Sequence, residues 1–496
     1  MTTLRFLVLF SVLLFISISS FAQTNSENNI NQKWWNNLEE GWQLYFRYNH
    51  EIDSIPTAQN LEKIYNLKKI DCAGNKDYYN KLILDINPLK DLPFLEEVNF
   101  SYCPVSSLEP LKNAKNLRKI DAERTLLSDL SPVSKLEKLE EIWVQKCAGI
   151  TSVASLSSLK NLKKLSLSAT GVTDISPLSS VTSLERLYLA YTKVKDISAL
   201  KNLENLEKVS FTATGIKDFS ALSNLKNLKT ILAWRTPISN LSPLSKLVGL
   251  EELYLNWTQV EDISSLKNLV NLRVIGLGNT KVSDISALSK MTQLTEVQLN
   301  DSKVIDIEPL KNAKNLEILS ISETGVEKID ALEDLFHLKK VFLNKTKIKS
   351  ISSLKNSTKL ELLEAGETEL NSLKEIENLV NLKDLYVYQT QVKTLKPLSE
   401  LVKLEKLFCG ETQIKSLEGL ENKPNLKVLD AQKTEVQDLT PIATCKKLET
   451  LVLIDTKLET MEVAEQLKRQ NLKKLYIKGT PLQQKIEEEE GEGDDY

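Results

Sequence analysis

Large apolar residues, mostly leucine, recur along this chain with a period of 22 residues. Counted from Leu162, apolar side chains fill offsets three, five, ten, thirteen, sixteen and nineteen, and the same offsets are filled from Leu250 and Leu272. Nineteen repeats begin at Leu67, Leu95, Leu117, Leu139, Leu162, then every 22 residues through Leu448, and finally Leu472. One such repeat is too small to bury its own apolar face, so we expect neighbouring repeats to stack into a continuous core.

Each repeat is expected to contain one strand and one short return turn. Leu165 and Leu167 are two residues apart, which is the period of an extended strand. The following apolar residues, from Val172 to Val181, are three apart, which suits a 3₁₀ turn. A period of 20–29 residues headed by L-x-x-L-x-L is typical of leucine-rich repeats. The sequence therefore predicts an α/β repeat solenoid, a leucine-rich repeat horseshoe with a parallel concave sheet and 3₁₀ turns on the convex side.

Two polar columns accompany the apolar one. Thr occupies offset eight in most repeats, as at Thr170 and Thr192, and we expect its hydroxyl to satisfy backbone groups where the chain leaves the strand. Asp stands just before the return turn, as at Asp174 and Asp196, where it is expected to cap free N–H groups. A ladder of carboxylates that binds cations is the alternative for the Asp column.

The repeats resemble those of a known family. The string Thr192-Lys193-Val194-Lys195-Asp196-Ile197-Ser198-Ala199-Leu200 is similar to the 22-residue repeats of bacterial internalins, and also to the leucine-rich regulatory subunit of protein phosphatase 1. The resemblance covers residues 67–480 and implies the solenoid fold. Thr stands where the internalins have Asn, and neither an immunoglobulin-like region nor a wall-anchor motif follows the repeats. The resemblance therefore does not imply host-cell invasion.

The segments outside the repeats predict export and capping. Residues 1–22 combine Arg5, an apolar stretch and a small residue at Ala22, which indicates a signal peptide cleaved after Ala22. An uncleaved membrane anchor is the alternative, and no segment of the mature chain has transmembrane length. Residues 23–66 are expected to form a helical cap, and residues 481–496 a disordered acidic tail. We expect a secreted protein, located outside the cell, on the cell surface or in the periplasm.

The composition argues against several chemistries. A net charge of −3 with both signs intermixed gives no basic stripe for nucleic acid. Five cysteines without framework spacing predict no disulfides. The only two histidines, His50 and His337, are about thirteen repeats apart, and neither a phosphate-binding loop nor a metal motif occurs. We therefore expect no enzymatic activity, no cofactor and no metal site.

The concave face carries the candidate site. Residues at offsets two, four and six of each repeat point away from the leucines, and offset seven lies at the edge of the sheet. Tryptophan, tyrosine and arginine dominate binding hot spots, and this face is rich in them. The candidate residues are Trp143, Tyr188, Tyr191, Trp234, Arg235, Tyr254 and Trp257, with a second group of Phe342, Tyr386 and Tyr388, beside Phe408. The alternative is that these rings only pack on one another and stabilise the sheet.

The sequence thus indicates an exported, monomeric scaffold that binds a protein partner through its concave face. Two alternatives stay open: a glycan-binding surface protein, because rings also stack on sugars, and a regulatory subunit of a phosphatase-type enzyme. The first repeat contains about six extra residues around Tyr78 and Tyr79, which are either a tolerated loop or part of the binding face.

Overall fold

The computed structural model describes residues 30–74 and 81–491. The expected signal peptide, the Tyr78–Tyr79 segment and residues 492–496 lie outside the described residues. The chain divides into two compact units, Met1–Ile216 and Lys217–Tyr496.

Unit 1 is built on a parallel sheet whose short strands pair in sequence order. Residues one repeat apart stand opposite each other, as Leu165 does to Leu187. The strands are β1 (Lys69–Asp71), β2 (Glu97–Asn99), β3 (Lys119–Asp121), β4 (Glu141–Trp143), β5 (Lys164–Ser166), β6 (Arg186–Tyr188) and β7 (Lys208–Ser210).

Unit 2 repeats this arrangement with twelve strands among its described residues, again parallel and in register. Its strands are β8 (Thr230–Leu232), β9 (Glu252–Tyr254), β10 (Val274–Gly276), β11 (Glu296–Gln298), β12 (Ile318–Ser320), β13 (Lys340–Phe342), β14 (Leu362–Glu364), β15 (Asp384–Tyr386), β16 (Lys406–Phe408), β17 (Val428–Asp430), β18 (Thr450–Val452) and β19 (Lys474–Tyr476).

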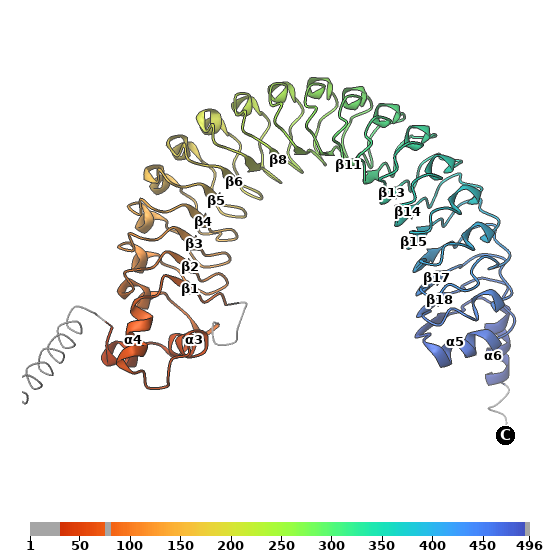
Figure 1. The fold of residues 1–496 in the computed structure, drawn as a ribbon, viewed down its shortest axis with the longest axis horizontal. Helices are drawn as coiled ribbons and strands as arrows, with labels where there is room; N and C mark the ends of the chain where they lie inside the picture. Colours follow the sequence, from red (N-terminus) through yellow and green to blue (C-terminus); the bar gives the residue numbers. More distant parts are fainter. Residues whose placement is uncertain (1–29, 75–80, 492–496) are drawn as a thin grey trace, which may run out of the picture. The chain divides into compact units, whose positions relative to one another are not determined.

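The expected 3₁₀ turns form the return half of the repeats, and the chain is a leucine-rich repeat solenoid. Within each unit the strands follow the inner side of the curve and the turns its outer side (Figure 1). The turns are Asn87–Asp91, Glu109–Leu111, Ser131–Val133, Ala154–Ser158, Ser176–Ser180 and Ser198–Asn202 in unit 1, and Ser220–Leu222, Ser242–Leu244, Ser264–Leu266, Ser286–Leu288, Glu308–Leu310, Asp330–Leu332, Ser352–Leu354, Lys374–Ile376, Lys396–Leu398 and Thr440–Ile442 in unit 2.

Both polar columns satisfy backbone groups as expected. The Thr170 hydroxyl is buried and donates to the carbonyl of Leu167, 2.6 Å away, and the same bond recurs along the column. Asp174 Oδ1 accepts the backbone N–H of Ser176 at 2.7 Å, which caps the 3₁₀ turn. Each Asp thus serves its own turn, and no group of three or more potential metal ligands occurs within the described ranges.

Between residue 30 and β1 the structure has three helices: α2 (Gln32–Asn36), α3 (Glu40–His50) and α4 (Ala58–Tyr65). Trp42 and Tyr45 on α3 are buried, and Trp42 Nε1 donates to the carbonyl of Asp85. The Tyr45 hydroxyl accepts the backbone N–H of Asp71 on β1 at 3.0 Å. The Tyr45 hydroxyl thereby satisfies a backbone N–H on β1, the edge strand of the sheet. Edge strands carry unpaired backbone groups that need such partners.

The C-terminal end contains α5 (Glu462–Gln470) before β19 and α6 (Pro481–Gly491) after it. The expectation of disorder from residue 481 is wrong as far as residue 491. The Thr480 hydroxyl accepts the backbone N–H of Gln483 and Leu482 is buried, so α6 is capped and anchored at its start. No helix in the described parts of the chain is long and apolar enough to cross a bilayer.

One core position departs from the repeat pattern. Lys423 stands at offset nineteen, where the neighbouring repeats have Leu401 and Cys445, and its exposed fraction is 0%. Its ammonium donates to the carbonyl of Ser399 at 2.5 Å. Burial lowers the pKa of Lys423, because the charged form is poorly solvated there.

We predict that Lys423→Leu stabilises the fold by about 1–2 kcal/mol, since an apolar side chain fits this column without a buried charge. Between the lowered pKa and the ordinary value of 10.5 the unfolded chain binds more protons than the folded chain, so wild-type stability rises with pH in this window. Urea unfolding at pH 7 and pH 10 measures both effects. The prediction fails if the variant is less stable than the wild type. It also fails if the free energy of unfolding of the variant rises between pH 7 and pH 10 as much as that of the wild type.

Candidate partner-binding face

The residues at offsets two, four, six and seven of the repeats form what we call the strand face. This face carries all ten candidate residues. The structure separates them into rings that pack on one another and rings that stay exposed, a distinction that the repeat pattern does not contain.

In unit 1, Trp143 and Tyr188 pack against each other, with ring centroids 5.7 Å apart. They stand on β4 and β6 and meet over Ser166 of the intervening strand β5. Trp143 Nε1 also donates to Glu141. Both rings are half-buried, whereas Tyr191 is 62% exposed. Mutual packing therefore accounts for Trp143 and Tyr188, but it leaves Tyr191 open to solvent.

In unit 2, Trp234, Arg235, Tyr254 and Trp257 form a surface that we call the Trp257 patch. Trp234 and Tyr254 have ring centroids 5.7 Å apart, and the Arg235 guanidinium lies over the Trp257 ring at 5.5 Å. Despite these contacts Trp234 is 40% exposed and Trp257 is 54% exposed. Partial burial together with Glu252 and Glu296 raises the pKa of the Tyr254 hydroxyl, so it is a neutral donor at physiological pH.

The exposed position at offset seven has an unusual backbone. Tyr191, Arg235 and Trp257 adopt φ angles of 59°, 54° and 63°, a left-handed conformation that bulky residues rarely take. The same sign recurs at this offset from Tyr102 onward in the described repeats, where Thr at offset eight closes the turn. The turn thus directs the side chain at offset seven away from the core, toward solvent.

Beside the Trp257 patch an amide bridge crosses a glycine. Asn256 Nδ2 donates to Gln298 Oε1 at 2.5 Å, and Gln298 Nε2 donates to Glu296 at 2.6 Å. Asn256 and Gln298 belong to repeats on either side of Gly276, and a Cβ on that glycine would lie 2.2 Å from Asn256 Oδ1. A Cβ at position 276 therefore requires the side chains that pass above it to move.

The second group lies further along unit 2. Tyr386 and Phe408 are stacked, with centroids 4.7 Å apart and planes at 7°. The Tyr388 ring lies over Gly366, where a Cβ would come within 2.5 Å of it. Phe342, Tyr386, Tyr388 and Phe408 are all half-buried.

Some residues of the strand face escaped the sequence analysis. Tyr102 at offset seven lies under the Arg124 guanidinium at 5.5 Å, and Tyr476 on β19 is exposed. Both follow the same offset rule, so the sequence contained the signal. Glu364 stands between Phe342 and Tyr386, and Asp430 stands beside Phe408. Their half-buried environment distinguishes them from exposed surface acids.

The remaining reactive groups are dispersed. His50 contacts the Tyr45 hydroxyl and His337 contacts the carbonyl of Lys314, at 3.3 Å and 3.0 Å. All five cysteines are buried. Burial raises the pKa of the Cys409 thiol, which opposes formation of a reactive thiolate.

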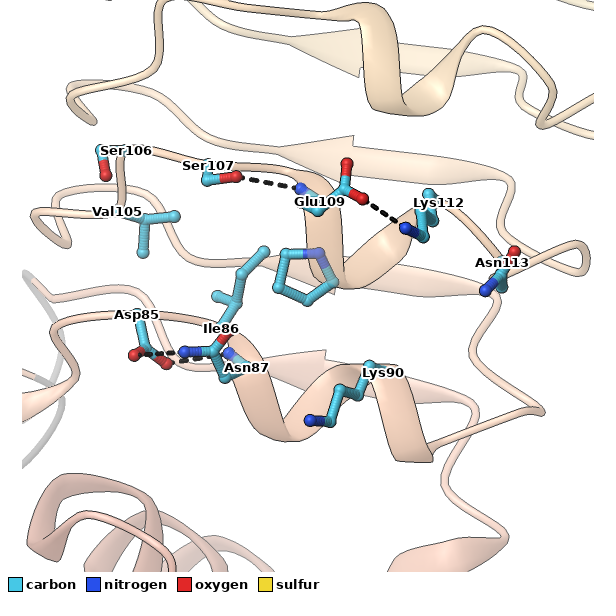
Figure 2. A pocket seen from close by; sticks show the side chains of 11 residues that line it. Asp85, Ile86, Asn87, Lys90, Val105, Ser106, Ser107, Glu109, Lys112 and Asn113 are labelled. Carbon is cyan, nitrogen blue, oxygen red and sulfur yellow. Dashed lines mark hydrogen bonds and ion pairs between the residues drawn. The ribbon is translucent and has the colours of Figure 1, made fainter.

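A cavity of about 430 Å³ lies between the 3₁₀ turns Asn87–Asp91 and Glu109–Leu111 (Figure 2). Several of its polar groups are engaged with one another. Asp85 accepts hydrogen bonds from Asn87, and Glu109 forms an ion pair with Lys112. The polar groups that line it do not converge on a shared point, so the cavity does not compete with the strand face as a site.

We predict that Gly276→Ala lowers the free energy of unfolding by about 1–3 kcal/mol, because the added methyl group displaces the amide bridge. The double variant Asn256→Ala with Gly276→Ala should recover part of this loss. Chemical denaturation of both variants and of Asn256→Ala completes a double-mutant cycle. Additive effects in the cycle would contradict the proposed contact.

Comparisons with known proteins identify the repeats. A family model described as "Leucine Rich repeats (2 copies)" matches residues 270–312. An internalin, InlF of Listeria monocytogenes, is 28% identical over 58% of this chain and 84% of its own, with a TM-score of 0.55. The leucine-rich repeat protein LIC12759 of Leptospira interrogans is 20% identical over 72% of this chain and 93% of its own, with a TM-score of 0.65.

The plant peptide hormone receptor RGFR1, solved in complex with RGF2, is 14% identical over 80% of this chain and 72% of its own, with a TM-score of 0.64, and shares the fold alone. No curated protein sequence matches the chain significantly. The repeat register, the 3₁₀ turns and the match to InlF agree. The chain is therefore a leucine-rich repeat protein, and its repeats are internalin-like.

Proposed function

We propose that this protein is an exported, non-catalytic scaffold that binds a protein partner through its strand face. The observation that carries the proposal is the Trp257 patch, where Trp234 and Trp257 remain 40% and 54% exposed. Large exposed apolar groups that gather on one surface mark interaction sites. The plant peptide hormone receptor RGFR1, which shares this fold, forms a complex with RGF2, and this supports a protein or peptide as the ligand.

The chemistry of the Trp257 patch favours a binding role over a purely structural one. Rings that only stabilise a sheet bury their faces against one another, as Trp143 and Tyr188 do. Trp257 instead offers its surface to solvent from a left-handed turn and holds Arg235 beside it. Trp and Arg are the residues that contribute most to protein interfaces, because they combine apolar area with directional polar groups.

The non-catalytic part of the proposal follows from the dispersed reactive groups. His50 and His337 belong to different units, and each contacts a neighbour of its own. A nucleophile needs a base within hydrogen-bonding distance. The candidate residues of the strand face provide rings and one guanidinium, which suit recognition.

We predict that the double variant Trp234→Ala with Trp257→Ala weakens capture of the partner by ~2 kcal/mol or more, which is ~30-fold in affinity. Both side chains are largely outside the core, so the melting temperature should change little. Affinity capture with the wild type and the variant as baits, followed by mass spectrometry, identifies proteins that only the wild type retains.

Phe336→Ala is the matched control, because Phe336 is a ring of similar exposure, 49%, that lies outside the strands and the strand face. It should leave capture unchanged. Treating the captured material with protease or with periodate separates a protein ligand from a glycan. Equal losses of stability and capture in the tryptophan variant would instead assign the rings a structural role.

Export is predicted to remove residues 1–22. Arg5, the apolar stretch and Ala22 are the features that a signal peptidase requires. Expression of the full chain in a bacterial host should release a mature protein that begins at Gln23. Intact-mass measurement of the exported fraction tests this, and a cytoplasmic product that retains Met1 would contradict export.

A further inference from the structure

Five side chains of unit 2 form a straight row across neighbouring strands, which we call the Tyr386 row. The strand register places Phe342 opposite Glu364, Glu364 opposite Tyr386, Tyr386 opposite Phe408, and Phe408 opposite Asp430. The row therefore reads ring, carboxylate, ring, ring, carboxylate on β13 to β17. All five side chains are half-buried and face the same side of the sheet.

The two carboxylates of the row have no compensating cation among the described side chains. Glu364 accepts a hydrogen bond from Asn344, and Asp430 accepts the backbone N–H of Gln432. Burial nevertheless raises the pKa of both carboxyl groups, and no cation is among the groups that shift either of them. Both carboxylates are thus partly desolvated.

Two lysines of this surface are engaged with other acids. Lys406 pairs with Asp384 at 3.4 Å, and Lys433 pairs with Glu411 at 3.2 Å. The contrast with unit 1 is direct, because Glu141 on β4 pairs with Lys164 at 2.7 Å and its pKa is lowered. Among the described Asp and Glu residues, Glu364 and Asp430 are the ones whose pKa is raised by burial.

Such charges cost stability in the free protein and favour a ligand that supplies positive charge. A partly desolvated carboxylate attracts a cation more strongly than one in water does, because the effective dielectric constant is lower. The stacked pair Tyr386 and Phe408 lies between the two carboxylates and offers an apolar platform. Rings beside a carboxylate also attract a cation through their own electron-rich faces.

The spacing of the row restricts the ligand. Glu364 and Asp430 stand on β14 and β17, three strand intervals apart, which is about 14 Å at ~4.8 Å per interval. An extended peptide advances ~3.4 Å per residue, so about four residues span this distance. Residues i, i+2 and i+4 of an extended segment face the same side.

We propose that the Tyr386 row binds an extended segment of the protein partner with two Lys or Arg side chains four residues apart and an apolar side chain midway. The basic side chains contact Glu364 and Asp430, and the apolar one lies on Tyr386 and Phe408. This inference rests on the proposed protein-binding function of the strand face and names the chemistry of the partner.

A synthetic peptide tests the proposal directly on the full-length mature protein. The probe is a fluorescently labelled peptide with the core Arg-Ser-Phe-Ser-Arg and blocked ends, and its binding is followed by fluorescence anisotropy. Two comparison peptides have Gln in place of both Arg, or the two Arg placed side by side. We expect saturable binding of the probe, at least about tenfold weaker binding of both comparison peptides, and weakening with added salt.

The double variant Glu364→Gln with Asp430→Asn should bind the probe at least about tenfold more weakly. Its melting temperature should stay unchanged or rise, since two desolvated charges are removed. The matched control is Glu333→Gln with Glu418→Gln, which removes the same charge from exposed acids that pair with Lys355 and Lys396 outside the strand face. This control should bind the probe as the wild type does.

Several outcomes would overturn the proposal. These are no saturable binding up to about 1 mM probe, equal weakening in the variant and its charge-matched control, or preference for a neutral oligosaccharide over the peptide. Failure of the proposed function is distinguishable. One such result is that the Trp234/Trp257 variant loses its captured protein while the probe peptide does not bind the Tyr386 row as expected. In that case the proposed protein-binding function stands, and only the proposal of a basic segment as the ligand is wrong.

Discussion

Stacking of one repeat's apolar side chains on those of the next is the interaction on which the rest of this structure depends. Leu165 and Leu187 occupy equivalent places in consecutive repeats, and both are fully buried. Burial of each leucine contributes about 1.5–3 kcal/mol to the stability of the fold. A shift of one residue in the strand register would expose all the core leucines of that strand. The fixed register then determines which side chains share a row on the strand face, as in the Tyr386 row.

Small residues determine how the strand face is shaped. Ser166 lies below the contact of Trp143 with Tyr188, Gly276 lies below the bridge from Asn256 to Gln298, and Gly366 lies below Tyr388. A side chain of ordinary size at any of these positions would force its neighbours apart. The pattern explains why rings two strands from each other meet, although a sheet with uniform side chains would separate them by about 10 Å.

Exposure and charge on the strand face have a cost that packing does not remove. Trp257 combines a left-handed backbone with a half-exposed ring, and such backbone conformations cost on the order of 1 kcal/mol or more. Glu364 and Asp430 are partly desolvated, with no paired cation in the described part of the chain. Features that reduce stability persist where surrounding structure compensates for them, here the leucine core, and where they serve binding.

The sequence by itself determined the repeat register, the alternation of strand and 3₁₀ turn, and the ten ring and arginine positions of the strand face, because the 22-residue period links each offset to one side of the sheet. Only the tertiary structure decided which of these side chains pack together and which stay exposed. It also revealed the buried Lys423, the helix after residue 481 and the desolvated carboxylates. The physical reason is that burial depends on side chains 22 or 44 residues away, whose sizes and contacts a repeat pattern does not specify.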